Sequence, residues 1–312
     1  MSLKNKFLYL ILAVLFLLAF SSCHSTSLET SQGELDVLQI DKDARISYLG
    51  PKGTYTEEAT ELFFSENSSL MPKTTVPEAI AAVVDGTADY AVIPQENTLG
   101  GAVINYVDAL ISEERVYVVG EVVLPISQTL MGLPGSSLDD ITLVCSHAQG
   151  ITQSEKWRKE HLPNAETKVM SSTAAAASHV AATNDKTIAA VAAPGAAKLY
   201  GLSVLARDVQ ITETNKTRFY VLSSSPLDEN GQSHAAFVVS CEASELYNII
   251  NSLHKAGLEL VTIHDRPEGS NLGVYNYIIE VESERGITEK QIEKIKENSS
   301  IRYLGCFDVL EI

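Results

Sequence analysis

The feature that most constrains the fold is an alternation of short apolar runs with helical patterns between residues 45 and 225. Runs of this length suit buried strands, and each is followed by a helical stretch rich in alanine or polar residues. This order is typical of an α/β domain on mostly parallel sheets, which bind ligands at the carboxyl ends of their strands. The predicted strands lie at 46–49, 89–93, 141–145, 167–171 and 187–191.

Local signals indicate where the first elements begin and end. The helix after the first strand is expected to open at Thr54, because Glu57 follows three residues later as in a capping box. The second strand is predicted to stop at Pro94, since proline cannot donate to a strand ladder. The apolar face of the first helix is predicted to contain Tyr55, Ala59, Leu62 and Phe63.

The pattern changes after a polar linker that ends near residue 233. Beyond it the predicted order is strand, helix, two strands, helix and strand, and this βαββαβ order is ferredoxin-like. The strands are predicted at 235–240, 258–263, 275–281 and 302–310, with helices at 243–255 and 288–297.

The first 23 residues have the pattern of a secretory signal, because two lysines precede an apolar run at 7–20. The run is too short to favour a spanning helix. Two serines before Cys23 resemble a bacterial lipoprotein cleavage site, at which the cysteine is lipidated. We therefore expect a signal at 1–23, a polar linker at 24–44, and an exported protein, periplasmic or tethered to a membrane through Cys23. A plain signal peptide, an uncleaved anchor and a cytoplasmic protein are the alternatives.

Composition excludes some partners. With 312 residues, of which 45 % are hydrophobic and 20 % charged, the chain can form two globular domains. The formal net charge of −17 argues against nucleic acid as a partner, because nucleic acid requires a basic surface. An anionic metabolite would need positive groups placed locally.

The three cysteines after Cys23 are Cys145, Cys241 and Cys306, an odd number without metal-ligand spacing. We expect buried free thiols. A bridge between Cys241 and Cys306 is the alternative, if their strands are neighbours.

Five short motifs stand at or beside predicted strand ends. In order they are GPKGTY at 50–55, PQENT at 94–98, SHAQ at 146–149, SSTA at 171–174 and NKTRF at 215–219. Each alone is a weak signal, because glycine turns and Ser/Thr helix starts are common. Together, in this order, they resemble the prephenate dehydratase family, whose members convert prephenate to phenylpyruvate with loss of water and carbon dioxide.

The resemblance implies a two-lobed catalytic domain at 45–225 that looks like a periplasmic binding protein. Its lobes would span about 45–125 and 127–208, with 211–225 returning to the first lobe. The ferredoxin-like region at 234–312 resembles the ACT domain of this family, which binds phenylalanine and associates into homodimers or homotetramers. No metal, nucleotide or flavin cofactor is implied.

The resemblance assigns the catalytic role to Thr217, as the donor of a hydrogen bond or proton to the leaving hydroxyl of prephenate. Arg218 is expected to pair with a substrate carboxylate, with an inter-strand salt bridge as the alternative. Glu96, Asn97 and Thr98 are predicted to line the substrate site. For Glu96, orienting Arg218 or capping a helix is the alternative.

Further substrate contacts are expected from the other motifs. Ser146 would complete an anion site at a helix start, and Gln153 lies on the same helix. Thr54 and Thr173 are predicted to face the cleft, with helix capping as the alternative for the fourth motif. Gln95 departs from the family, which usually has an aliphatic residue there.

The effector motifs of the family are only partly present. Leu246, Arg266 and Pro267 match them, whereas Ser244 and Glu245 replace a glycine and an alanine. A glutamate would add bulk and negative charge opposite the carboxylate of phenylalanine. The sequence therefore places feedback inhibition in doubt.

The leading hypothesis is decarboxylating dehydration of prephenate in phenylalanine biosynthesis, with arogenate as a further substrate, since the two differ only in a keto or amino group. The alternative is a lipid-tethered binding protein for an aromatic or carboxylated metabolite.

Overall fold

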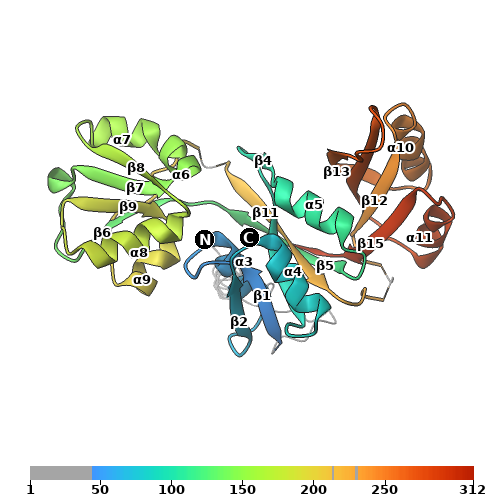
Figure 1. Ribbon diagram of the computed structural model, residues 1–312, viewed down its shortest axis with the longest axis horizontal. Helices are drawn as coiled ribbons and strands as arrows, with labels where there is room; N and C mark the ends of the chain where they lie inside the picture. Colours follow the sequence, from blue (N-terminus) through green and yellow to red (C-terminus); the bar gives the residue numbers. More distant parts are fainter. Residues whose placement is uncertain (1–43, 213, 229–230) are drawn as a thin grey trace, which may run out of the picture. The chain divides into compact units, whose positions relative to one another are not determined.

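The computed structural model describes residues 44–212, 214–228 and 231–312 (Figure 1). The predicted signal at 1–23, with Cys23, and all but the last residue of the predicted linker at 24–44 lie outside the described residues. Within the described part, no helix combines the length and apolarity needed to cross a membrane.

The first sheet has seven strands in the order β16-β5-β11-β3-β1-β2, with β4 paired to β3. Strand β1 pairs in parallel with β2 and β3, whereas β11 runs antiparallel between β3 and β5. The strands are β1 (Arg45–Leu49), β2 (Ser69–Lys73), β3 (Tyr90–Asn97), β4 (Gly101–Ala102), β5 (Tyr117–Pro125), β11 (Lys216–Ser223) and β16 (Val309–Glu311). Its helices are α3 (Tyr55–Phe63), α4 (Val76–Val84) and α5 (Ile104–Ser112).

The second sheet has five strands in the order β10-β6-β9-β7-β8. They are β6 (Thr129–Gly132), β7 (Leu143–His147), β8 (Glu166–Met170), β9 (Ile188–Ala192) and β10 (Ser203–Ala206). Its helices are α6 (Ala148–Gln153), α7 (Glu155–His161), α8 (Thr173–Thr183) and α9 (Pro194–Tyr200), with a 3₁₀ turn at Leu138–Asp140. The chain passes between the two sheets after β5 and again before β11, as the predicted two lobes require.

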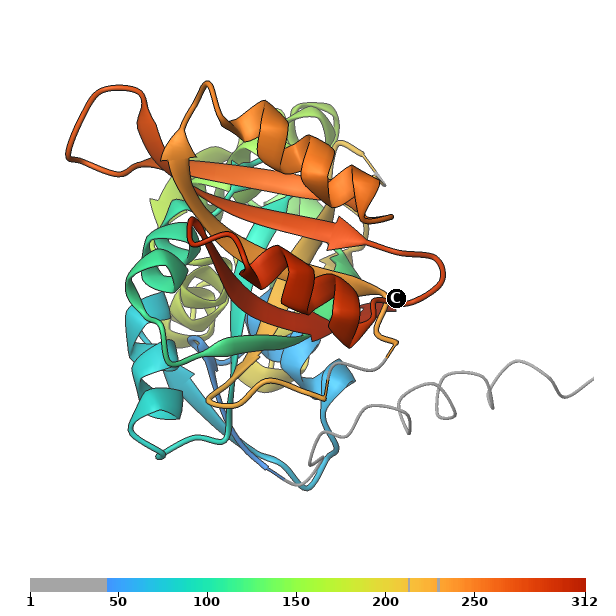
Figure 2. The ribbon, with the colours of Figure 1, turned by 90° about the vertical axis from the view of Figure 1, so that its right-hand side faces the viewer.

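The third sheet has four antiparallel strands in the order β13-β14-β12-β15, the ferredoxin-like arrangement that the sequence predicts. Its elements are β12 (His234–Glu242), α10 (Leu246–Lys255), β13 (Glu259–Pro267), β14 (Val274–Glu282), α11 (Glu289–Lys296) and β15 (Ile301–Phe307). Figure 2 shows α10 and α11 together on one face of this sheet. The α/β fold class with two lobes and a ferredoxin-like domain is thus confirmed.

Side chains alternate between the two faces of the third sheet, and both faces are buried. Phe237 and Val239 pack with the helix residue Ile249, whereas Val238 belongs to the core of the first lobe with Tyr220. The ferredoxin-like domain and the first lobe therefore share one hydrophobic core.

Two predicted strand ends are wrong. Strand β3 does not stop at Pro94 but continues to Asn97, because the β11 pairing jumps from Glu96 to Pro94 and a bulge accommodates the proline. The predicted last strand is two strands: β15 ends at Phe307, and β16 pairs with β5 in the first sheet.

The first helix also differs in detail from the prediction. Thr54 caps α3 by accepting from the Glu57 backbone N–H, but the Glu57 carboxylate accepts from Gly53 N–H and the Tyr48 hydroxyl, so the capping box is incomplete. Leu62 is 39 % exposed. The buried residues are Thr56, Ala59, Thr60 and Phe63.

Cys145, Cys241 and Cys306 are buried and are not joined to one another by a disulfide, as expected. Strands β12 and β15 are neighbours, but Cys306 lies opposite Ala235 rather than Cys241. The alternative of a Cys241–Cys306 bridge is therefore wrong.

Gly305 allows the third sheet to approach the first. Its φ of +142° disfavours any other residue, and an added Cβ would overlap the carbonyl oxygen of Val118 on β5. We predict that Gly305→Ala destabilises the protein by about 1–3 kcal/mol more than Gly269→Ala, as overpacking does. Gly269 is the matched control because its φ is +96° but its Cβ position is open. Urea unfolding measures the free energy of unfolding of both variants. Equal losses of stability would mean that the close approach of Gly305 to Val118 contributes nothing to stability.

Candidate functional site

Strand β11 carries polar side chains on both of its faces. Thr217 lies opposite Asn97, and Arg218 lies opposite Glu96. Successive strand residues point to opposite faces, so neighbouring residues of β11 enter two different environments. We call these the cleft cluster, around Thr217, and the interface cluster, around Arg218.

The cleft cluster centres on the side-chain amide of Asn97. Its Nδ2 donates to Thr217 Oγ1 at 2.9 Å and to Asn215 Oδ1 at 2.8 Å. Its Oδ1 accepts from Gln149 Nε2 at 2.8 Å and from the backbone N–H of Gly100 at 2.9 Å. Because both ends of this amide are bonded within the protein, Asn97 orients its neighbours.

Thr217 retains a free hydrogen. Its hydroxyl oxygen accepts from Asn97, and no described residue accepts the hydroxyl proton in return. The residue is 8 % exposed. A hydroxyl that already accepts a hydrogen bond in a largely desolvated place is polarised toward donation.

The cleft cluster joins the two lobes. Gln149 and Gln153 belong to α6 of the second lobe, and Asn215 lies where the chain returns to the first. Gln153 Oε1 accepts from Asn215 Nδ2 at 3.2 Å and from Gln128 Nε2 at 2.5 Å. The amide chain therefore runs from Thr217 across the gap between the lobes.

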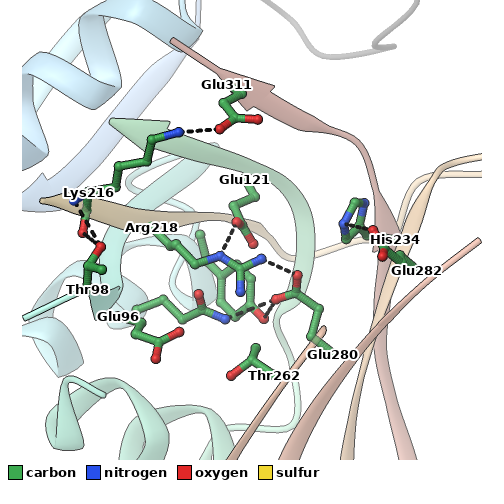
Figure 3. A network of polar contacts seen from close by, with 12 residues as sticks. Glu96, Thr98, Glu121, Lys216, Arg218, His234, Thr262, Glu280, Glu282 and Glu311 are labelled. Atoms are coloured by element: carbon green, nitrogen blue, oxygen red, sulfur yellow. Dashed lines mark hydrogen bonds and ion pairs between the residues drawn. The ribbon is translucent and has the colours of Figure 1, made fainter. Parts of the chain in front are cut away.

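The interface cluster holds Arg218 between two buried carboxylates (Figure 3). Arg218 Nε donates to Glu121 on β5 at 2.6 Å, and Nη2 donates to Glu280 on β14 at 2.5 Å. Both glutamates are fully buried, and Arg218 is 18 % exposed. Glu280 also accepts from the Tyr220 hydroxyl at 2.6 Å and from Gln95 Nε2 at 3.1 Å.

The charges of this cluster do not balance unless one acid is neutral. Burial, and next the Glu280 carboxylate, raise the pKa of Glu121 well above its ordinary value. Burial opposes the charged form of Arg218, but the two glutamates outweigh it and raise the pKa of the guanidinium. With Glu121 protonated, one carboxylate faces one guanidinium, and the buried cluster is neutral.

The prediction that Arg218 pairs with a substrate carboxylate conflicts with this geometry. The guanidinium is engaged by two glutamates on the face of β11 opposite Thr217, so the alternative of a salt bridge describes it better. Glu96 does not orient Arg218 either, because its carboxylate lies 3.7 Å from His264 Nε2.

Other predicted contacts have structural partners. The Thr98 hydroxyl donates to the Lys216 carbonyl and accepts from its N–H, which fixes the start of β11. Ser146 is fully buried and donates to the Val191 carbonyl under α6. Helix α6 begins after His147, whose side chain accepts from the Gln149 backbone N–H, while the Ser146 hydroxyl is directed to Val191. The anion site at this helix start stays a prediction.

Neither Thr54 nor Thr173 lines the cavity of about 390 Å³ that lies next to their motifs. This cavity is lined by Gly50, Pro51, Pro72, Lys73, Thr74, Ser171, Ser172 and Ala175. It thus lies between parts of the first and fourth motifs, which come from different lobes.

One of the effector-motif residues, Arg266, contacts the first lobe, and so does the nearby His264. Arg266 forms an ion pair with Asp108 on α5, with Nε and Oδ1 2.5 Å apart. His264 Nδ1 bonds to the Tyr106 hydroxyl on the same helix. Leu246 is the first residue of α10, and Pro267 ends β13.

Several residues of the two clusters were not predicted. Gln128 and Asn215 lie where the chain crosses between the lobes. Their position as polar residues next to a strand was the signal available in the sequence. Glu121 is the single acid of the apolar strand β5, and Glu280 directly follows two isoleucines in β14. These positions could have marked both acids as buried and paired. In the described part of the chain, no group of three or more His, Cys, Asp or Glu side chains could hold a metal ion.

Two α/β lobes that the chain crosses twice, with polar side chains hydrogen-bonded at their junction, define a two-lobed α/β protein. The family model "Prephenate dehydratase" matches residues 46–227, so the chain belongs to the prephenate dehydratase family. Its sequence is 32% identical to a bifunctional chorismate mutase/prephenate dehydratase of Aquifex aeolicus, over 86% of this chain and 75% of that protein. It is also 32% identical to arogenate dehydratase 5 of Arabidopsis thaliana, over 84% of this chain and 67% of that protein.

A solved structure supports the same assignment. Prephenate dehydratase from Arthrobacter aurescens, in complex with L-Phe, superposes with a TM-score of 0.76 at 30% identity. The match covers 85% of this chain and 90% of that one. The similarity thus extends beyond residue 227 into the ferredoxin-like domain.

The protonation of Glu121 should appear in the pH dependence of stability. A carboxyl whose pKa is raised in the folded state binds more protons folded than unfolded, so stability falls as pH rises from its ordinary pKa through the raised one. We predict that Glu121→Gln flattens this fall, as measured by urea midpoints from about pH 5 to 9.

Glu282→Gln is the matched control, because Glu282 is about half exposed on the neighbouring sheet. The same slope in wild type and Glu121→Gln would show that Glu121 is ionised in the folded protein.

Proposed function

We propose that the protein is a prephenate dehydratase that converts prephenate to phenylpyruvate, with Thr217 as the donor to the leaving hydroxyl. Family membership and the similarity to proteins with this name support the activity. The observation that supports the role of Thr217 is its hydrogen bond from Asn97, which leaves the hydroxyl proton for a ligand in the cleft.

The reaction requires little beyond this donor. The bond between the ring and its carboxylate breaks, and carbon dioxide leaves. That electron pair enters the ring as the bond to the ring hydroxyl breaks, and the departing oxygen takes a proton to become water. Aromatisation drives the step, so the protein must mainly hold the substrate and stabilise the departing oxygen.

Threonine is a weak acid, so its surroundings must assist it. Asn97 holds the oxygen and directs the hydrogen away from itself, and Asn215 and Gln149 hold Asn97 in turn. This arrangement preorganises the donor. We include arogenate as a further substrate, because it differs from prephenate only at the side-chain keto group and a relative is named an arogenate dehydratase.

We predict that Thr217→Val lowers kcat for phenylpyruvate formation by about 10²- to 10³-fold, the usual effect of removing a donor to a developing oxyanion. Valine keeps the shape of threonine, so KM should change little. Thr217→Ser is the matched control, since it keeps the hydroxyl and should retain much of the activity.

Equal kcat values for the valine variant and wild type would remove Thr217 from the mechanism. If the wild-type protein formed no phenylpyruvate from prephenate, the tethered binding protein would replace the enzyme as the proposal.

We further propose that residues 234–312 are an ACT domain with a weakened phenylalanine site. The related Arthrobacter protein has been solved with L-Phe, which supports an effector role for this domain. Glu245 in this chain places a carboxylate at the start of α10, and Arg266 is paired with Asp108. A homodimer or homotetramer stays a prediction.

Restoring the family motif tests this proposal. We predict that Ser244→Gly/Glu245→Ala binds phenylalanine more tightly than wild type in calorimetry, because the substitution removes a carboxylate facing that of the ligand. Ser283→Gly/Glu284→Ala is a control with the same changes elsewhere in the domain. Tight binding of phenylalanine by wild type, with no gain in the variant, would contradict the proposal.

A further inference from the structure

The residues on both sides of Thr217 are held by acids that follow residue 234. Lys216 forms an ion pair with Glu311 on β16, with Nζ and Oε1 2.5 Å apart, and Arg218 pairs with Glu280 on β14 (Figure 3). The first pair is exposed to solvent and contributes little. The second is buried, so it can restrain the strand next to Thr217.

The restraint acts where strand pairing is irregular. The register between β11 and β3 shifts between Arg218 and Phe219, which leaves Gln95 as the extra residue of a bulge. A bulge disrupts the ladder locally, so the backbone hydrogen bonds alone hold this part of β11 less firmly. The two glutamates on Arg218 add side-chain restraints at the same point.

Glu280 also holds the strand that carries Asn97. Its Oε2 accepts from Gln95 Nε2, and Gln95 lies two residues before Asn97 on β3. Gln95 is fully buried, and a buried amide without partners is costly. The carboxylate of Glu280 therefore satisfies the donor end of the Gln95 amide, whereas the buried Oε1 has no hydrogen-bond partner among the described residues.

One side chain of the ferredoxin-like domain thus connects to both strands of the cleft cluster. Glu280 reaches Thr217 through Arg218, and it reaches Asn97 through Gln95. Asn97 donates a hydrogen bond to Thr217, and the relative position of the two side chains decides where the Thr217 hydroxyl proton points.

We propose that Glu280 and Arg218 are positioning residues for the Thr217 donor, so that the ferredoxin-like domain supplies part of the catalytic geometry. This inference rests on the proposed function. The kinetic prediction differs from the one made by substrate binding at Arg218. Loss of a positioning residue lowers kcat, whereas loss of a ground-state contact with substrate raises KM.

The test compares Glu280→Gln with Glu282→Gln, the same substitution two residues along β14. We expect Glu280→Gln to lower kcat about 10- to 100-fold with KM nearly unchanged, as small misplacements of a reacting group do. Glu282→Gln should leave both constants unchanged. Arg218→Lys should retain more kcat than Arg218→Gln, because lysine keeps the charge between the glutamates.

Two kinetic results would overturn the inference. Glu280→Gln could match Glu282→Gln in kcat, which would show that the pair does not affect the donor. Alternatively, the Arg218 variants could raise KM at unchanged kcat, which would return Arg218 to the substrate site.

Hydrogen–deuterium exchange separates this inference from the proposed function, since it needs no turnover. Peptides covering β11 should exchange faster in Glu280→Gln than in wild type or Glu282→Gln. Equal exchange would contradict the restraint even if wild type were inactive on prephenate. Should Glu280→Gln not fold, the same comparison between Arg218→Gln and wild type decides, and unchanged exchange there counts against the proposal.

Discussion

Strand β11 lies between β3 and β5, and the structure around it depends on that pairing. Pairing with β3 places Thr217 beside Asn97, whose side-chain amide donates to the Thr217 hydroxyl. The alternation of the strand then requires Arg218 to point the other way, into a core where a lone guanidinium would be unstable. Glu121 and Glu280 satisfy it there, and Glu280 comes from a different domain. Strand β11 therefore depends on the domain that follows it for one of the two carboxylates that pair with Arg218.

The shared core has the same consequence for folding. The third sheet buries one face under its own helices and the other against the first lobe, and β16 returns to pair with β5. A domain joined only by a linker would present a polar surface at this junction. Here the junction is apolar around a small buried ionic cluster, so the third sheet and the strands β3 and β11 are packed against each other without an intervening polar surface.

The motifs that contain Thr217 and Asn97 could be recognised in the sequence because motifs at strand ends are local signals, and the α/β and ferredoxin-like orders follow from periodicity. The partners of these residues could not be predicted in this way. The two glutamate partners of Arg218 were not predicted, because no local pattern shows that the far face of β11 is covered by another domain. Glu280 lies in a largely apolar strand, and its role can be recognised only from its contact with Arg218, 62 residues away. The split of the last strand was missed because three residues carry too little periodicity to define β16.

The central claim is that substrate meets Thr217 on one face of β11 and never reaches Arg218 on the other. A crystal structure of the slow Thr217→Val variant with prephenate tests it most directly. The account predicts the ring hydroxyl of prephenate within contact distance of residue 217, with Arg218 still bound to Glu121 and Glu280. A substrate carboxylate paired with Arg218, or prephenate bound away from β11, would contradict it.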